Sequence, residues 1–360
     1  MTMEEKTAGQ EPPIAHGGTP PGAGSGAPAG DRGAQARDFG RRALAVESNS
    51  VLVATIALIL FIGIAHPDFL TWSQLKEVVQ NAVYVGIIAA GMAFLISMRE
   101  IDLSVGSIFG LSIVCSALLM QHGWNPWLAG LAGVVLAGGM GLVNATAVQF
   151  IAIPAIVATL ATMSIFRGLA QALSNGQQVT GLPANNSFFT FLGGDKLGLP
   201  VSVWVLILVV VVLTAVLRLT PYGYRVRAIG SNPEAATFSG ISIPRTRVQT
   251  LVLVGVLSGL AGMLGLAFFI SGDPNIGTGF ELQAIAAAVI GGTPLRGGSA
   301  TVVGAVLGAI LLSAVNSGLA YFNVPVNWSN FATGAVILTA VALDSLIRGR
   351  RRYRRQALDG

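Results

Sequence analysis

The sequence predicts an all-α polytopic membrane protein with about ten transmembrane helices. Of its 360 residues, 53% are hydrophobic and only 10% are charged, and the mean hydropathy is +0.70. Soluble domains carry about 25% charged residues, so a soluble enzyme of this length would lack the charge that its outer surface needs. The apolar residues are gathered in runs separated by polar loops. Several runs approach the ~20 residues with which a helix crosses a bilayer core.

The two ends of the chain differ in composition from the rest. Residues 1–39 are rich in Gly, Pro and Ala and hold too little apolar surface to fold, so we expect a disordered cytoplasmic tail. Arginines directly precede the first apolar run, and a second basic tail, 348–360, begins with RGRRRYRR. Basic residues beside membrane spans mark the cytoplasmic side. Both termini are therefore predicted to be cytoplasmic, with the basic clusters held at anionic lipid rather than at nucleic acid.

Residues 50–347 are predicted to form the transmembrane domain. An even number of spans returns the C-terminus to the side of the N-terminus. The run 281–294 is short and is open to interpretation as a half-helix or a re-entrant segment. The predicted spans are 50–65, 80–98, 103–121, 126–146, 153–173, 201–218, 249–270, 281–294, 300–318 and 327–347.

The loops on the other side of the membrane are poor in arginine and rich in aromatic residues. Tryptophans at span ends form the belt expected at a membrane interface, so we assign these loops to the extracytoplasmic face. The longest, 175–198, is polar enough to contact a ligand or a protein partner, or it is an ordinary solvated loop. Two spans carry glycines at helix-packing spacing, namely Gly130, Gly133, Gly138, Gly139 and Gly141, and Gly259, Gly262 and Gly265.

The longest polar interruption of the apolar body is the loop 218–247. It contains five arginines and one acidic residue, Glu234, which places it on the cytoplasmic side. Ser231 and Asn232 are residues typical of a helix N-cap, and Ser231 and Glu234 have capping-box spacing. Pro233 suits a first helical turn, and Gly240 suits a C-terminal stop. These features predict a short helix, which either contacts a partner or forms one turn of a solvated loop.

A charged cluster, Arg99-Glu100-Ile-Asp102, lies between two predicted spans. We expect its charges to neutralise one another at a sharp turn, with Asp102 capping the helix that follows. The alternative is a polar constriction on a transport path. A glycine-rich junction at 290–300 resembles this region, because GSATVVG at 298–304 is similar to GSIFG at 106–110, and the similarity suggests an internal repeat.

Several catalytic patterns are absent from the sequence. The three lysines, Lys6, Lys76 and Lys196, do not follow a P-loop pattern, so this chain does not hydrolyse ATP at a P-loop. No H-E-x-x-H motif occurs, and the three histidines lie outside the predicted spans, which disfavours a membrane enzyme. Ionisable residues within the spans are few, and Arg167 is expected to snorkel from a span end. An ion-coupled secondary carrier is therefore disfavoured. Cys115 is the only cysteine, which excludes an intrachain disulfide.

Three motifs resemble those of a known family, namely EIDLSVGS at 100–107, RAIGSNPEAATFSGI at 227–241 and AIAAAVIGGTPLRGGSATVVGAVLGAILL at 284–312. In this order and spacing, the chain resembles the permease subunit of monosaccharide ABC importers of the ribose/xylose/galactoside group, over about 51–348. The resemblance implies a type II ABC importer-like permease of the bacterial plasma (inner) membrane. Its substrate would be a pentose, a hexose or a related polyol, and the alternative is a branched-chain amino acid ABC permease.

The resemblance also implies partners and site residues. The partners are ABC ATPase subunits, a second permease copy in a homodimer, an extracytoplasmic sugar-binding protein and membrane lipid. The ATPase subunits would bind the ATP, so this chain is expected to carry no cofactor. No catalytic or metal residue is implied. The sequence departs from the commoner family pattern at Arg99 and Glu100, where many relatives have small residues. The expected ATPase-coupling helix comprises Asn232, Pro233, Glu234, Ala235, Ala236, Ser239, Gly240 and Ile241. The polar turn motif comprises Glu100, Asp102, Leu103, Ser104, Gly106 and Ser107. The second glycine junction comprises Gly291, Gly292, Gly297, Gly298 and Ser299.

Overall fold

The structure is a computed structural model that describes residues 50–325 together with 328, 331, 332, 334, 335, 338 and 339. The chain divides into two compact units, and the described residues all belong to the second, Ala43–Gly360. The predicted tails 1–39 and 348–360 lie outside the described residues, as does much of the predicted span 327–347.

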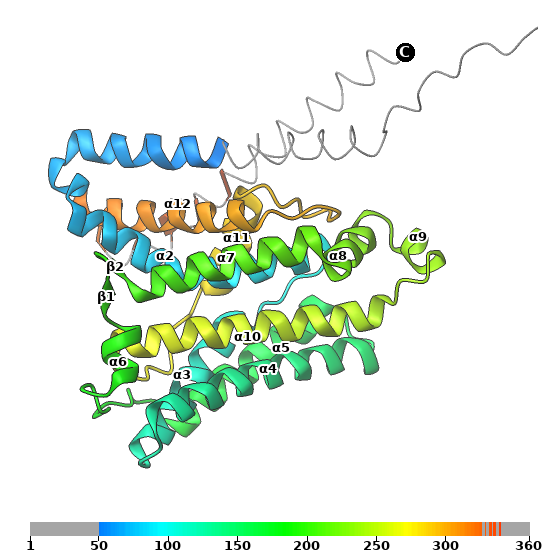
Figure 1. Cartoon of the computed structure of the whole chain (residues 1–360), viewed down its shortest axis with the longest axis horizontal. Helices are drawn as coiled ribbons and strands as arrows, with labels where there is room; N and C mark the ends of the chain where they lie inside the picture. The colour runs from blue at the N-terminus through cyan, green and yellow to red at the C-terminus, as the bar shows by residue number, and fades with distance from the viewer. Residues whose placement is uncertain (1–49, 326–327, 329–330, 333, 336–337, 340–360) are drawn as a thin grey trace, which may run out of the picture. The chain divides into compact units, whose positions relative to one another are not determined.

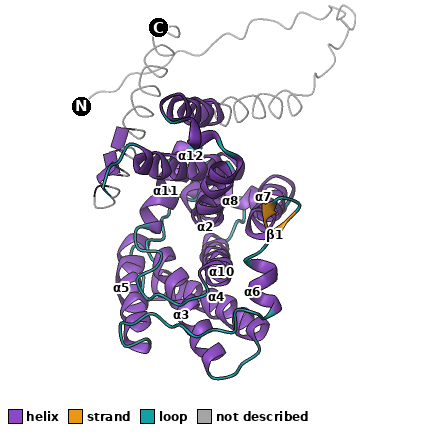
Figure 2. Cartoon of the chain, turned by 90° about the vertical axis from the view of Figure 1, so that its left-hand side faces the viewer, coloured by secondary structure: helices purple, strands orange, loops and turns teal. Residues whose placement is uncertain are grey.

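The described part of the chain is predominantly helical (Figures 1 and 2). Each predicted span up to residue 318 falls on a helix, although three of these helices are short, namely Ser50–Ala65, α3 (Val105–Gln121) and α11 (Phe280–Ile290). The total of ten membrane crossings stays a prediction. Six helices of the described residues are long and apolar enough to cross a membrane, namely α2 (Trp72–Ser97), α4 (Pro126–Phe150), α5 (Ala155–Leu173), α7 (Val201–Leu219), α10 (Ile243–Phe269) and α12 (Val302–Tyr321).

Short elements occupy the connections between the long helices. A 3-10 turn, η1 (Pro67–Leu70), precedes α2. The extracytoplasmic loop predicted at 175–198 contains α6 (Ser187–Leu192) and begins an antiparallel pair of strands, β1 (Asp195–Lys196) and β2 (Leu199–Pro200). The chain continues from the C-terminal end of α7 into α8 (Pro221–Ser231) and α9 (Pro233–Phe238). Figure 1 shows α9 and α6 at opposite ends of the bundle.

Helix α2 is the central helix of the bundle. Of its most apolar window, 89% is buried by other parts of the chain, compared with 28% for α5 and 39% for α4 and for α7. It packs against α7, α10, α11 and α12, while α10 also packs along α4. The outer helices keep exposed apolar faces, as lipid-facing helices do, and the buried faces form one large hydrophobic core.

Most of the predicted packing glycines lie where α4 meets α10, whereas Gly262 and Gly265 of α10 pack against α3. A Cβ atom added to Gly141 would lie 2.5 Å from the carbonyl oxygen of Leu251, and one added to Gly255, which was not predicted, would lie 2.5 Å from that of Ala137. These separations are too short for any side chain, so the two backbones touch directly. Gly139 is different, because an added Cβ atom would have no neighbour within 4 Å. Its assignment as a packing glycine is wrong.

Candidate functional site

The polar loop between α7 and α10 folds into two helices rather than the single short helix that was predicted. The first, α8, ends at Ser231, so the predicted capping box between Ser231 and Glu234 is wrong. Asn232 separates the helices and caps α9, since its Oδ1 accepts a hydrogen bond from the amide of Ala235 at 3.0 Å. Gly240 follows α9 with a φ of 78°, as a C-terminal stop requires.

The sequence does contain a signal for α8 that was overlooked. Thr220 precedes Pro221, and this order of N-cap residue and first-turn proline is a helix start. In the structure the hydroxyl of Thr220 accepts a hydrogen bond from the amide of Gly223 at 3.3 Å. Because α8 packs against α2, α7 and α10, it joins the short α9 to the core of the bundle.

Helix α9 exposes most of its surface. Ala236 is buried, while Glu234, Ala235 and Thr237 are exposed. Phe238 is 92% exposed, although it was not among the predicted site residues. An exposed aromatic side chain on a polar surface is typical of a contact site for a partner. Its position inside the RAIGSNPEAATFSGI motif was the available signal.

Arg99 connects the turn after α2 to the end of α8. Its Nε atom donates a hydrogen bond to the carbonyl oxygen of Gly230 at 2.8 Å, and an Nη atom donates to that of Ser231 at 3.0 Å. The last carbonyl groups of a helix lack helical partners and carry the negative end of its dipole. Arg99 therefore caps α8 from a distant part of the chain. Its backbone adopts a left-handed conformation, with a φ of 66°.

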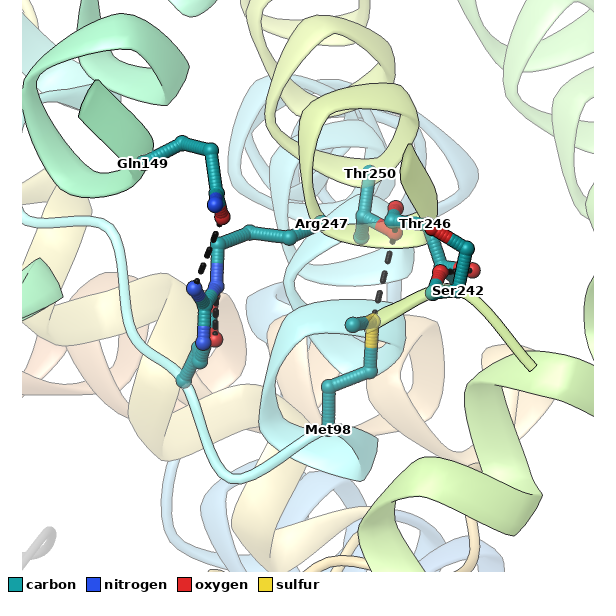
Figure 3. Close-up of polar contacts among 7 residues, drawn as sticks. Met98, Gln149, Ser242, Thr246, Arg247 and Thr250 are labelled. Atoms are coloured by element: carbon teal, nitrogen blue, oxygen red, sulfur yellow. Dashed lines mark hydrogen bonds and ion pairs between the residues drawn. The ribbon is translucent and has the colours of Figure 1, made fainter. Parts of the chain in front are cut away.

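Glu100 connects the same turn to the first turns of α10. The Nε atom of Arg247 lies 2.5 Å from Oε1 of Glu100, and the Glu100 side chain is 11% exposed. An Nη atom of Arg247 also donates to Oε1 of Gln149 in α4 at 3.2 Å (Figure 3). Burial raises the pKa of Glu100, and Arg247 opposes that rise. The turn after α2 is thus attached to the chain on both sides of α9, through Arg99 to the end of α8 and through Glu100 to the beginning of α10.

Asp102 is fully buried and has partners of its own. Its Oδ1 accepts hydrogen bonds from the amide of Ser104 at 2.7 Å and from the Ser104 hydroxyl at 2.6 Å, and Asn144 donates to its Oδ2 at 3.1 Å. Thr162 donates to Asn144 at 2.7 Å, so the network joins α3, α4 and α5. Burial raises the pKa of Asp102, and the bonds from Ser104 and Asn144 oppose this. The prediction that Arg99, Glu100 and Asp102 neutralise one another is wrong.

The prediction that Asp102 caps α3 is wrong, because Ser104 is the N-cap residue and Asp102 accepts a hydrogen bond from the amide of Ser104 rather than from the first turn of the helix. The other members of the predicted polar turn are also fixed. Leu103 donates its amide to the Thr159 hydroxyl at 3.1 Å, and Ser107 donates its hydroxyl to the carbonyl oxygen of Ser104 at 2.8 Å.

The second glycine junction meets the same turn. The amide of Gly298 donates to the carbonyl oxygen of Ser97 at 2.9 Å, and a Cβ atom added to Gly297 would lie 2.7 Å from that oxygen. Both glycines have positive φ angles, 75° for Gly297 and 87° for Gly298. A Cβ atom on Gly230 would also overlap the oxygen of Ser97. The three motifs, far apart in sequence, therefore converge where α2 and α8 end.

Two of the predicted site residues lie away from the place where α2 and α8 end. Gly106 lies within α3 and packs against the backbone of Gly277, while Gly291 packs against Gly304 where α11 meets α12. The helical Gly106 and the left-handed Gly298 also have different conformations. The short similarity between GSIFG and GSATVVG therefore does not correspond to a shared local structure.

Arg167, in α5, reaches the connection between α10 and α11, and its expected snorkelling to the membrane interface stays a prediction. One of its Nη atoms donates to the carbonyl oxygens of Pro274 and Ile276, at 3.0 and 2.8 Å. Its guanidinium therefore orders the connection between α10 and α11.

A central buried helix, six helices long enough to span a membrane and a polar helix pair braced against the core define a multi-pass membrane protein. The family model described as "Branched-chain amino acid transport system / permease component" matches residues 74–341. The chain belongs to this family of transport permeases. No solved structure matches it.

Curated relatives cover most of the chain. It is 38% identical to the ribose import permease protein of Bacillus subtilis (strain 168), over 80% of this chain and 89% of that protein. It is 34% identical to the L-arabinose ABC transporter permease protein of Azospirillum brasilense, over 85% and 90%. The D-allose transport system permease protein of Escherichia coli (strain K12) is 34% identical, over 82% and 90%.

These comparisons confirm the resemblance to ABC importer permeases. The relatives are transport subunits and not enzymes. Membership of an import permease family implies ABC transporter partners, such as an ATPase and a binding protein.

Proposed function

We propose that the chain is the membrane-spanning subunit of an ATP-driven importer of a simple sugar, a pentose, a hexose or a related polyol. The observation that carries this proposal is the convergence of the three motifs where α2 and α8 end, because it ties an exposed short helix to the centre of the bundle. The reported relatives are named for ribose, L-arabinose and D-allose. They favour a sugar over the branched-chain amino acid of the family description.

In this proposal α9 is the coupling helix that docks on the ATPase subunit. Glu234, Phe238 and Gly240 form its exposed contact surface, with Asn232, Pro233, Ala235, Ala236, Ser239 and Ile241 shaping it. ATP is bound and hydrolysed on the partner chain, and this chain carries no cofactor. Closure of the ATPase subunits displaces α9. Because Arg99 and Glu100 attach the end of α8 and the beginning of α10, on either side of α9, to the turn after α2, that displacement reaches the central helix.

The assembly follows from the same proposal. A type II permease of ten spans, formed by residues 50–347 with the coupling loop 218–247, works as a homodimer surrounded by lipid in the bacterial plasma membrane. The arginines of the coupling loop support a cytoplasmic position for it, and both termini lie on that side. The opposite face, where α6 and the β1–β2 pair lie, receives the sugar-binding protein.

The proposal is tested with the complex reconstituted in proteoliposomes together with its ATPase and binding protein. Uptake of labelled ribose, L-arabinose and D-allose is measured alongside ATP hydrolysis. Glu234→Arg and Phe238→Ala should abolish uptake and the stimulation of ATP hydrolysis while the permease still inserts. Phe150→Ala is the matched control, because Phe150 is 81% exposed at the end of α4 and lies outside α9. Normal uptake by a stable Glu234→Arg variant contradicts the proposal.

A further inference from the structure

A cavity of about 270 Å³ lies between α2, α10, α11 and α12. Its lining residues come from the middle of α2, the end of α10, the beginning of α11 and the middle and second half of α12. Helix α9 precedes the beginning of α10, so the cavity lies toward the opposite end of the bundle from α9. That is the end proposed to receive the binding protein.

One wall of the cavity is aromatic and rigidly held. The ring centroids of Tyr84 and Phe269 are 5.9 Å apart, and Phe109, behind the wall, packs against Phe280 with tilted rings whose centroids are 5.2 Å apart. Tyr84 is 2% exposed, and its hydroxyl accepts a hydrogen bond from Nε2 of Gln80 at 2.7 Å. Packing and hydrogen bonding therefore fix the orientation of this wall before any ligand arrives.

Beside three small apolar residues, the remaining lining side chains are amides and hydroxyls, namely Asn81, Gln283, Ser313, Asn316 and Ser317. Ser313 donates its hydroxyl to the carbonyl oxygen of Val78 at 2.7 Å. Within the described part of the chain, Asn81 and Gln283 have no side-chain hydrogen bond, so their amides can both donate to and accept from a ligand. None of the lining residues is charged.

This combination suits a small neutral ligand with many hydroxyl groups. Amide side chains match hydroxyls that donate and accept, and aromatic faces pack against the C–H faces of a sugar ring. An amino acid would bring a carboxylate and an ammonium group, and burying these without charged partners is costly. The volume lies near the small end of ligand pockets, about 300–1,000 Å³, which fits a single monosaccharide.

A second cavity, beside Arg167 and Glu281, is less suitable. Arg167 already donates to Pro274 and Ile276, and Gln171 donates to Asn275 at 3.0 Å. Arg167, Gln171 and Asn275 are therefore engaged within the protein, while Oε2 of Glu281 has no hydrogen-bond partner among the described residues.

We infer that the cavity between α2, α10, α11 and α12 is a subsite at which the permease itself contacts the sugar, with Asn81 and Gln283 bonding its hydroxyls and Tyr84, Phe269 and Phe280 packing on its ring. The inference rests on the proposed function. It adds a step of recognition in the membrane after release from the binding protein, and it makes the permease contribute to selectivity among sugars.

Asn81→Leu and Gln283→Leu remove the hydrogen-bonding groups at similar volume. In the reconstituted complex, each should lower the uptake of the preferred sugar about five- to tenfold, the loss expected for one hydrogen bond. Each should also change the order of preference among ribose, L-arabinose and D-allose, a change that a structural defect does not produce. Ser317→Trp fills the cavity and should abolish uptake, whereas Val211→Trp, at a position 60% exposed on α7, should not.

The outcomes separate this inference from the proposed function. If the wild-type complex transports a sugar and both leucine variants keep its rate and order of preference, the cavity is not a subsite. If the wild-type complex transports none of the three sugars, the proposed function itself fails. If Ser317→Trp does not fold, the leucine variants decide the question.

Discussion

Removing the Arg99 guanidinium should uncouple ATP hydrolysis from sugar uptake. Of its two hydrogen bonds to the end of α8, one is partly buried and the other is exposed. Hydrogen bonds to charged groups contribute about 1.5–3 kcal/mol, and because water competes for exposed groups, we assign each of these about 1 kcal/mol. Arg99→Ala loses both bonds and keeps the left-handed backbone, so its unfolding free energy should fall by about 2 kcal/mol. Arg99→Gly also loses both hydrogen bonds. Because glycine adopts the left-handed backbone conformation without the roughly 1–2 kcal/mol that it costs other residues, this variant regains that amount. Its stability should stay near that of the wild type.

The two variants therefore separate stability from coupling. Thermal unfolding is followed with a thiol-reactive dye on Cys115, the only cysteine of the chain. Coupling is the amount of sugar transported per ATP hydrolysed. Both variants should lose coupling to the same extent, although only Arg99→Ala unfolds at a clearly lower temperature. Wild-type coupling in Arg99→Gly would refute the role of the guanidinium and reduce Arg99 to a stabilising contact.

Three further predictions concern the turn between α2 and α3 and the groups that hold it. Asn144→Leu removes the three buried hydrogen bonds of Asn144 between α3, α4 and α5 and should lower the unfolding free energy by about 3 kcal/mol. An unchanged unfolding temperature in the dye assay would contradict a stabilising role for this network. Gly230→Ala should disrupt the contact of α8 with α2 and abolish uptake, whereas Gly139→Ala should be neutral in the same transport assay. Glu100→Arg and Arg247→Glu should each impair uptake, and the double variant should restore part of it if the ion pair is what matters.

The positions of the long helices could be predicted from the sequence because hydropathy is a local property. The apolar runs that predict α7 and α10 need no knowledge of the rest of the chain. The same holds for the end of α9, where Gly240 supplies the left-handed conformation that a helix stop requires. The central position of α2 was not accessible in this way, since its burial depends on four helices that follow it in the chain.

The partners of the charged residues could not be predicted for the same reason. Arg99 and Glu100 are adjacent to Asp102, so mutual neutralisation was the simplest local expectation. Their actual partners, in α8 and α10, lie more than a hundred residues away. The sequence does contain a signal for the cavity. Asn81 and Gln283 are polar residues within apolar helices, and polar residues within spans usually face the interior of the bundle.

The burial of α2 has a consequence for biosynthesis. Gln80, in its third turn, is 3% exposed, and its Oε1 accepts a hydrogen bond from the Ser202 hydroxyl of α7. Helix α7 begins about 100 residues after α2 ends, so at ordinary translation rates α2 waits roughly 5–20 s for it. During that interval α2 lacks the four helices that bury it in the finished bundle and the hydroxyl that bonds Gln80. The helix that holds the finished bundle together is therefore the one most dependent on completion of the chain.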